Sequence, residues 1–89
     1  IYVFSPKGDV FDLPENSTPV DFAFCVHTNL GLYIHSVKVN GKIAPVDHLL
    51  KCGDVLEIVK SKSKKIPSRN WLRFVKTHQA KAKIRKYNN

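Results

Sequence analysis

The amino-acid sequence predicts an α+β fold in which a mixed sheet curls over one helix and a basic helical segment follows. Short runs of β-branched and aromatic residues alternate with turn residues, as in small antiparallel sheets. One apolar stretch with a helix-start signal lies between two pairs of such runs. The last acidic residue is Glu57, and all charged residues after it are lysines or arginines. Eighty-nine residues are enough for one domain with one modest core.

Five strands are expected, over residues 1–4, 10–13, 33–39, 42–44 and 55–59. Pro6-Lys7-Gly8-Asp9 has turn composition and makes the first two runs a hairpin. Asn40-Gly41 is typical of a type I′ turn and makes the next two runs a second hairpin. A short helical turn is expected over 46–50, before the last strand.

The helix is expected to begin at Pro19, because Thr18 is a suitable N-cap and Asp21 follows three residues later. Its expected end is Gly31, where a left-handed residue can close the last turn. The apolar residues of this helix cover an arc of about 200°, and most of that face should be buried. The order of two strands, helix, hairpin and strand is that of a ubiquitin-like β-grasp.

The chain divides by composition into residues 1–60, the β-grasp, and residues 61–89, a basic linker with amphipathic helical segments. A Ser/Lys linker precedes Pro67-Ser68, which predicts the start of a helix over 69–76. Apolar spacing predicts a second helical stretch over about 79–87. We expect residues 1–60 to fold without the segment that follows. The apolar side of the later helices would be formed by Trp71, Phe74, Val75, Ile84 and Tyr87.

Charge is distributed very unevenly along the chain. Residues 1–59 contain four lysines and all seven acids, a net charge of −3, whereas residues 60–89 contain eleven cations and no acid. Such asymmetry favours a polyanionic partner, most commonly nucleic acid, for the basic segment. The alternative is a solvated helix face.

The composition also restricts the class of protein. The sequence has no run of about 18 apolar residues that would span a membrane and no leader that resembles a signal peptide. It contains no Met, which indicates a piece of a larger protein. Two distant cysteines without a C-x-x-C spacing fit a reduced compartment. We expect a soluble, cytoplasmic module.

Several motifs in fixed order resemble the TGS domain, a β-grasp module of threonyl-tRNA synthetases, certain GTPases and RelA/SpoT proteins. They are Tyr2-Val3-Phe4-Ser5-Pro6-Lys7-Gly8-Asp9, Ser17-Thr18-Pro19-Val20-Asp21-Phe22-Ala23, Val26-His27-Thr28, Lys38-Val39-Asn40-Gly41-Lys42-Ile43, Gly53-Asp54-Val55 and Glu57-Ile58. The RelA/SpoT branch fits best, because the sequence continues as Pro67-Ser68-Arg69-Asn70-Trp71-Leu72, Val75-Lys76-Thr77 and Ala80-Lys81-Ala82-Lys83-Ile84-Arg85.

The resemblance implies a parent enzyme that makes or hydrolyses (p)ppGpp, with this segment in its regulatory half. It also implies contact with the 3′ CCA end of an uncharged tRNA on the ribosome, and His27 corresponds to the family's CCA-contacting histidine. This chain departs from the family pattern at three places. Gly31-Leu32-Tyr33-Ile34 replaces the usual Gly-His-Arg-Cys, and Asn70 replaces the usual Asp. After Lys76-Thr77, His78-Gln79 replaces residues of the Ser-Arg type.

The candidate RNA-binding residues are His27, Arg69, Arg73 and Lys76. His27 has an alternative interpretation as a core histidine, because it falls within the apolar arc of the predicted helix. On a helix Cys25 and His27 point about 200° apart, so they do not form a nucleophile and base pair. The sequence also has no metal-ligand spacing and no glycine-rich phosphate loop. We therefore expect no catalytic residue, no metal and no cofactor in this segment.

Two functions from different classes follow from these observations. The first is an RNA-sensing regulatory module that binds uncharged tRNA and the ribosome. The second is a protein-interaction module that contacts other domains of the parent enzyme or another protein. No membrane partner is expected, and the sequence leaves the oligomeric state open.

Overall fold

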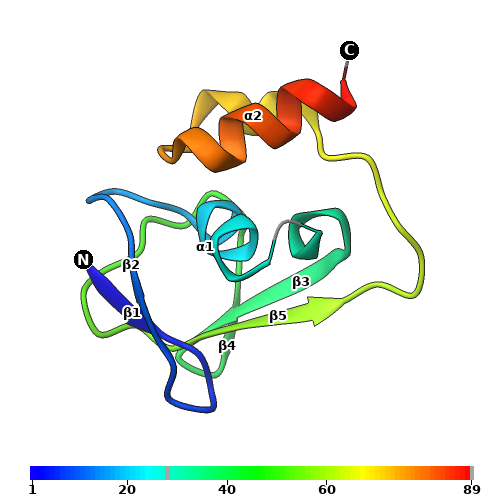
Figure 1. The fold of residues 1–89 in the computed structure, drawn as a ribbon. Coiled ribbons are helices and arrows are strands. Elements are labelled where there is room, and N and C mark those ends of the chain that lie inside the picture. The colour runs from blue at the N-terminus through cyan, green and yellow to red at the C-terminus, as the bar shows by residue number, and fades with distance from the viewer. Residues whose placement is uncertain (28, 89) are drawn as a thin grey trace.

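The structure, a computed structural model, describes residues 1–27 and 29–88, so Thr28 of the Val26-His27-Thr28 motif lies outside the described residues. In chain order the elements are β1 (Tyr2–Phe4), β2 (Val10–Asp12), α1 (Pro19–Val26), the 3-10 helix η1 (Leu30–Leu32), β3 (Ile34–Val39), β4 (Lys42–Ala44), β5 (Leu56–Lys60), the 3-10 helix η2 (Arg69–Arg73) and α2 (His78–Tyr87) (Figure 1).

Two antiparallel units make up the sheet. β1 pairs with β2, and β3 lies between β4 and β5. A parallel bridge between Phe4 and Val55 joins the two units, and the Phe4 N–H donates to the carbonyl oxygen of Asp54 at 2.9 Å. Asn40 and Gly41 both have positive φ, 53° and 83°, as a type I′ turn requires. The predicted mixed sheet, both hairpins and the α+β β-grasp class are confirmed.

The predicted helix at the centre of the sequence is shorter than expected. α1 begins at Pro19 but ends at Val26, and η1 follows. In a continuous α-helix Phe24 and Gly31 would lie about 10 Å apart along the axis. Here the chain folds back, so that a Cβ placed on Gly31 would overlap the Phe24 ring. Gly31 is thus needed for close packing, and its expected role as a left-handed helix cap is wrong.

Two other predicted helical segments also differ. The helical turn expected over 46–50 is limited to residues 46–47, where the His48 N–H donates to Pro45 O at 3.1 Å. The Leu50 N–H donates instead to Ser17 O at 2.9 Å across the fold. The helix expected over 69–76 is reduced to η2, because the backbone N–H groups of Lys76 and Thr77 donate to the carboxylate of Asp21. The helix expected over 79–87 is present as α2.

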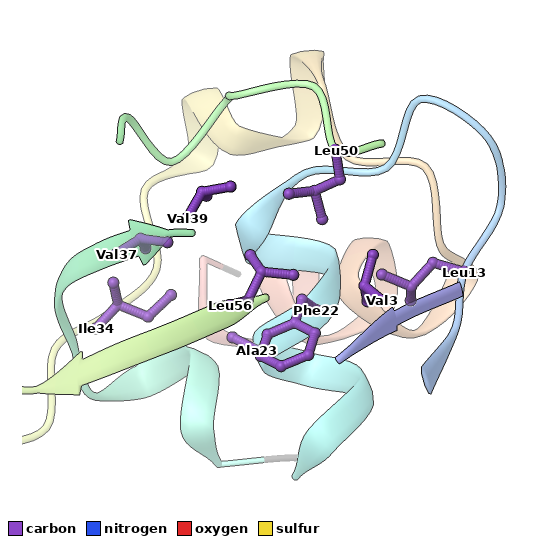
Figure 2. Packing of buried hydrophobic residues seen from close by; sticks show 9 residues of the cluster. All are labelled: Val3, Leu13, Phe22, Ala23, Ile34, Val37, Val39, Leu50 and Leu56. Carbon is purple, nitrogen blue, oxygen red and sulfur yellow. The ribbon is translucent and has the colours of Figure 1, made fainter. Parts of the chain in front are cut away.

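The main core lies between the sheet and one side of α1. Figure 2 shows its nine residues, with Phe22 and Ala23 of α1 directed at the strands. The full cluster is Val3, Leu13, Phe22, Ala23, Ile34, Val37, Val39, Leu50 and Leu56. The predicted burial of the helix against the sheet is therefore confirmed for this side of α1.

A second core lies on the other side of α1, where α2 crosses it. Figure 1 shows α1 between the sheet and the C-terminal helices, so the molecule has three layers. The second core consists of Val20, Phe24, Val75, Ala80 and Ile84. Trp71 packs against both cores. The wide apolar arc of the predicted helix is thus covered by two partners, the sheet and the basic segment.

Candidate nucleic-acid interface

His27 directly follows α1 and is exposed. Its backbone is extended, with φ −157° and ψ 139°, so the side chain no longer follows the helical periodicity. Nδ1 accepts a hydrogen bond from the backbone N–H of Asn29 at 3.1 Å, which leaves the hydrogen of the neutral ring on Nε2. The interpretation of His27 as a buried core histidine is wrong. α1 ends at Val26, so His27 lies outside the helix and does not belong to its apolar face.

A surface hollow of about 520 Å³ adjoins His27. Its walls combine aliphatic, aromatic, amide, imidazole and ammonium groups. The lining residues are Val26, His27, Asn29, Leu30, Tyr33 and Lys60. A second hollow, of about 450 Å³, shares Val26, Leu30 and Lys60 with the first and extends to Lys7 and Phe11 of the first hairpin.

Tyr33 and Lys60 are functional candidates that sequence reasoning missed. Ile34 pairs with Lys60 across β3 and β5, and the Ser61 N–H donates to Tyr33 O at 2.6 Å. A predicted pairing of β3 with β5 would have placed Tyr33 near Lys60 from the sequence alone. Tyr33 stands where the resembled family usually has arginine, so this departure lies in the hollow next to His27.

The three cations predicted on one helix face do not share a face. Arg69 and Arg73 lie on η2, whereas Lys76 lies beyond its end, and all three are exposed. A 3-10 helix has three residues per turn, so Arg69 aligns with Leu72 and not with Arg73. Arg69 and Leu72 accordingly line one hollow of about 270 Å³ together with Arg85 and Asn88. The structure therefore places Arg69 and Arg85 at the same hollow, with Arg73 and Lys76 outside its lining.

The basic segment has no internal neutralisation within the part of the chain that the structure describes. None of its lysine or arginine side chains forms an ion pair with the described residues. Lys64 and Lys86 lie over the ring of Tyr87, at 5.0 and 5.8 Å from its centre. The ammonium groups of these two lysines are held at the Tyr87 ring, whereas no arginine guanidinium group donates a hydrogen bond within residues 1–27 and 29–88.

Cys25 is half-buried on α1, and Cys52 is exposed. Burial raises the pKa of the Cys25 thiol above its ordinary value, and the nearby charge of Asp12 raises it further. A raised pKa keeps the thiol protonated at neutral pH, which is the opposite of what a nucleophile requires. No group of three or more metal-ligating side chains gathers among the described residues.

Helices of the described ranges are all too short or too polar to cross a membrane.

Comparison with known proteins relates the chain to a family. The family model described as TGS domain matches residues 1–60. Over 98% of the chain, the sequence is 47% identical to a guanosine-3′,5′-bis(diphosphate) 3′-pyrophosphohydrolase of Aquifex aeolicus and to a bifunctional (p)ppGpp synthase/hydrolase RelA of Mycobacterium tuberculosis. Over 96% of the chain, it is 47% identical to a GTP pyrophosphokinase of Myxococcus xanthus. The chain spans 11 to 12% of the length of these relatives.

Proposed function

Since the chain belongs to the TGS domain family and matches segments of RelA/SpoT-type (p)ppGpp enzymes over nearly its whole length, we propose that it is the RNA-sensing regulatory module of such an enzyme. The proposed ligand is the 3′ CCA end of an uncharged tRNA on the ribosome. The proposed parent makes or hydrolyses (p)ppGpp in the cytoplasm, and this module controls that activity and contacts the parent's other domains.

The observation that carries the proposal is the exposed His27 beside a hollow with an aromatic wall. Single-stranded RNA ends are recognised by stacking of unpaired bases on aromatic rings and by hydrogen bonds to base edges. Tyr33 offers the ring, and Nε2 of His27 offers a donor to a base edge. Lys60 supplies a positive charge for a neighbouring phosphate.

The test uses the full-length parent with ribosomes and uncharged tRNA. His27→Ala should reduce stimulation of (p)ppGpp synthesis by tRNA, while basal synthesis stays close to that of the wild type. His35→Ala is the matched control, because His35 is also exposed but lies on β3 outside the hollow. Normal stimulation of the His27→Ala enzyme would refute the proposed contact.

Thermal stability of the same variant provides a second readout. His27 is exposed and makes one hydrogen bond through its side chain, so its truncation should change the free energy of unfolding by no more than about 0.5 kcal/mol. A large loss of stability would instead assign His27 a structural role.

The protein-interaction alternative has its own observation. Tyr2 and Val10 are 56% and 55% exposed and lie on the same face of the β1–β2 ladder. Exposed apolar side chains on a β-grasp favour contact with a protein surface. Salt distinguishes the two functions, because RNA binding weakens log-linearly as salt rises, whereas an apolar protein contact does not.

A further inference from the structure

The hollow between η2 and α2 has the chemistry of a phosphate site. Arg69 comes from η2 and Arg85 from the last turn of α2, and both line the same space of about 270 Å³. Water occupies about 30 Å³ per molecule in the liquid, so this space has room for a phosphate group and several waters. Two guanidinium groups on one hollow repel each other, and an anion between them would relieve that repulsion.

The hollow is built on restrained elements. The side-chain amide of Asn88 donates to Pro67 O at 2.8 Å and to Ile84 O at 2.9 Å, which ties the start of the η2 segment to the end of α2. Ile84, one residue before Arg85, is fully buried in the second core. The backbones that carry Arg69 and Arg85 are therefore held in place before any ligand arrives.

A simpler explanation accounts for only one of the two arginines. The negative end of the α2 dipole favours a cation in the last helical turn, where Arg85 lies. Arg69 is the first residue of η2, so the favourable interaction of a cation with a helix C-terminus does not explain its position. The convergence of both groups on one hollow thus calls for an anion.

Resting on the proposed RNA-sensing function, we infer that the Arg69–Arg85 hollow binds a backbone phosphate of the RNA, at a place separate from the His27 hollow. Guanidinium groups match phosphate oxygens in a bidentate geometry. Lys81 lies one helical turn before Arg85 on α2, so a further positive charge adjoins the hollow, and residues 60–89 contain no acid. A chain of repeated phosphates fits such a surface better than one small anion does.

The test measures binding of the 89-residue chain to a labelled single-stranded RNA ending in CCA, over a series of salt concentrations. Arg69→Gln and Arg85→Gln should each weaken binding about fivefold to tenfold. Each should also reduce the slope of log K against log salt by about 0.7, the value for one phosphate contact on a single strand. Arg69→Lys should recover the slope but only part of the affinity, because lysine keeps the charge and loses the fork.

Arg73→Gln is the matched control. It removes one exposed arginine from the same 3-10 helix but does not line the hollow. Equal effects of Arg69→Gln, Arg85→Gln and Arg73→Gln would overturn the inference and leave a diffuse basic surface. Unchanged melting temperatures would confirm that the variants are folded.

Further outcomes separate this inference from the proposed function. If His27→Ala leaves RNA binding and CCA preference intact while Arg69→Gln weakens binding, the CCA contact fails and the phosphate site stands. If inorganic phosphate binds the hollow but the arginine variants bind RNA normally, the site serves a free anion and the inference fails. A wild-type chain that does not bind RNA, or that binds an acidic protein through these arginines, also refutes it.

Discussion

Asp21 Oδ1 accepts two hydrogen bonds from Thr77, one from its backbone N–H and one from its hydroxyl, both at 2.9 Å. Asp21 lies on α1 and Thr77 is the N-cap of α2, so one carboxylate joins the starts of both helices. The same carboxylate accepts from the N–H and hydroxyl of Thr18 and from the Lys76 N–H. It is fully buried and faces only neutral donors among the described residues.

Asp21→Asn is expected to destabilise the chain by about 2 to 4 kcal/mol. The substitution replaces one acceptor oxygen with a donor that faces other donors, which leaves buried N–H groups unpaired. Urea denaturation measures the effect. Asp47→Asn is the control, because Asp47 is exposed, and it should be nearly neutral. An Asp21→Asn midpoint equal to that of the wild type would show that the carboxylate does not hold the helices together.

Thr18→Ala is expected to cost about 1 kcal/mol or somewhat more. Thr18 occupies the N-cap as predicted, but its hydroxyl donates to Asp21 Oδ2 at 3.1 Å. Its effect should therefore depend on Asp21. In a double-mutant cycle, Thr18→Ala should cost less in the Asp21→Asn background than in the wild type. Additive free energies would mean that Thr18 stabilises α1 without its acidic partner.

Gly31→Ala is expected to destabilise the chain by about 1 to 3 kcal/mol through overpacking. The new Cβ would overlap the ring of Phe24, which is fully buried in the second core. Phe24→Leu shortens that side chain, so Gly31→Ala should cost less in this background. Chemical denaturation of the four proteins tests this. An equal cost in both backgrounds would place the strain elsewhere.

Truncation after Lys60 is expected to leave a fragment that folds but unfolds at lower temperature than the full chain. The main core belongs wholly to residues 1–60, apart from the packing of Trp71 against it. Val20 and Phe24 would lose their cover, and burial of each such side chain contributes about 1.5 to 3 kcal/mol. Calorimetry of both lengths measures the difference. A fragment without cooperative unfolding would show that the predicted boundary at residue 60 divides one folding unit.

Cys25 is expected to react with iodoacetamide more slowly than Cys52 at pH 8. Burial and the charge of Asp12 raise the Cys25 pKa and so suppress its thiolate, whereas Cys52 is exposed. The raised pKa also links Cys25 to the pH dependence of folding. Its contribution to the free energy of unfolding is fully present below the ordinary thiol pKa and is lost as pH rises through the pKa of Cys25 in the folded chain. Peptide mass spectrometry gives the two rates. A faster Cys25 would contradict the assigned direction of its pKa.

Sequence alone determined those features whose causes act over a few residues. The Asn40-Gly41 turn follows from the backbone angles that these residues allow, and the start of α1 follows from Thr18-Pro19. The alternation and order of the apolar runs determined the β-grasp, and the composition of residues 60–89 located the basic segment. The exposed position of His27 did not follow, because the end of α1 depends on packing.

Only the tertiary structure decided which distant groups meet. The carboxylate of Asp21 was predicted as part of a helix cap, but its partners in Lys76 and Thr77 lie 55 and 56 residues further along the chain. Arg69 lines a hollow with Arg85 because the η2 segment and α2 pack on the second face of α1. A hydrophobic pattern indicates that a face is buried but not which segment covers it. Likewise, the residues around Asp21 do not indicate which distant backbone N–H groups will donate to its carboxylate.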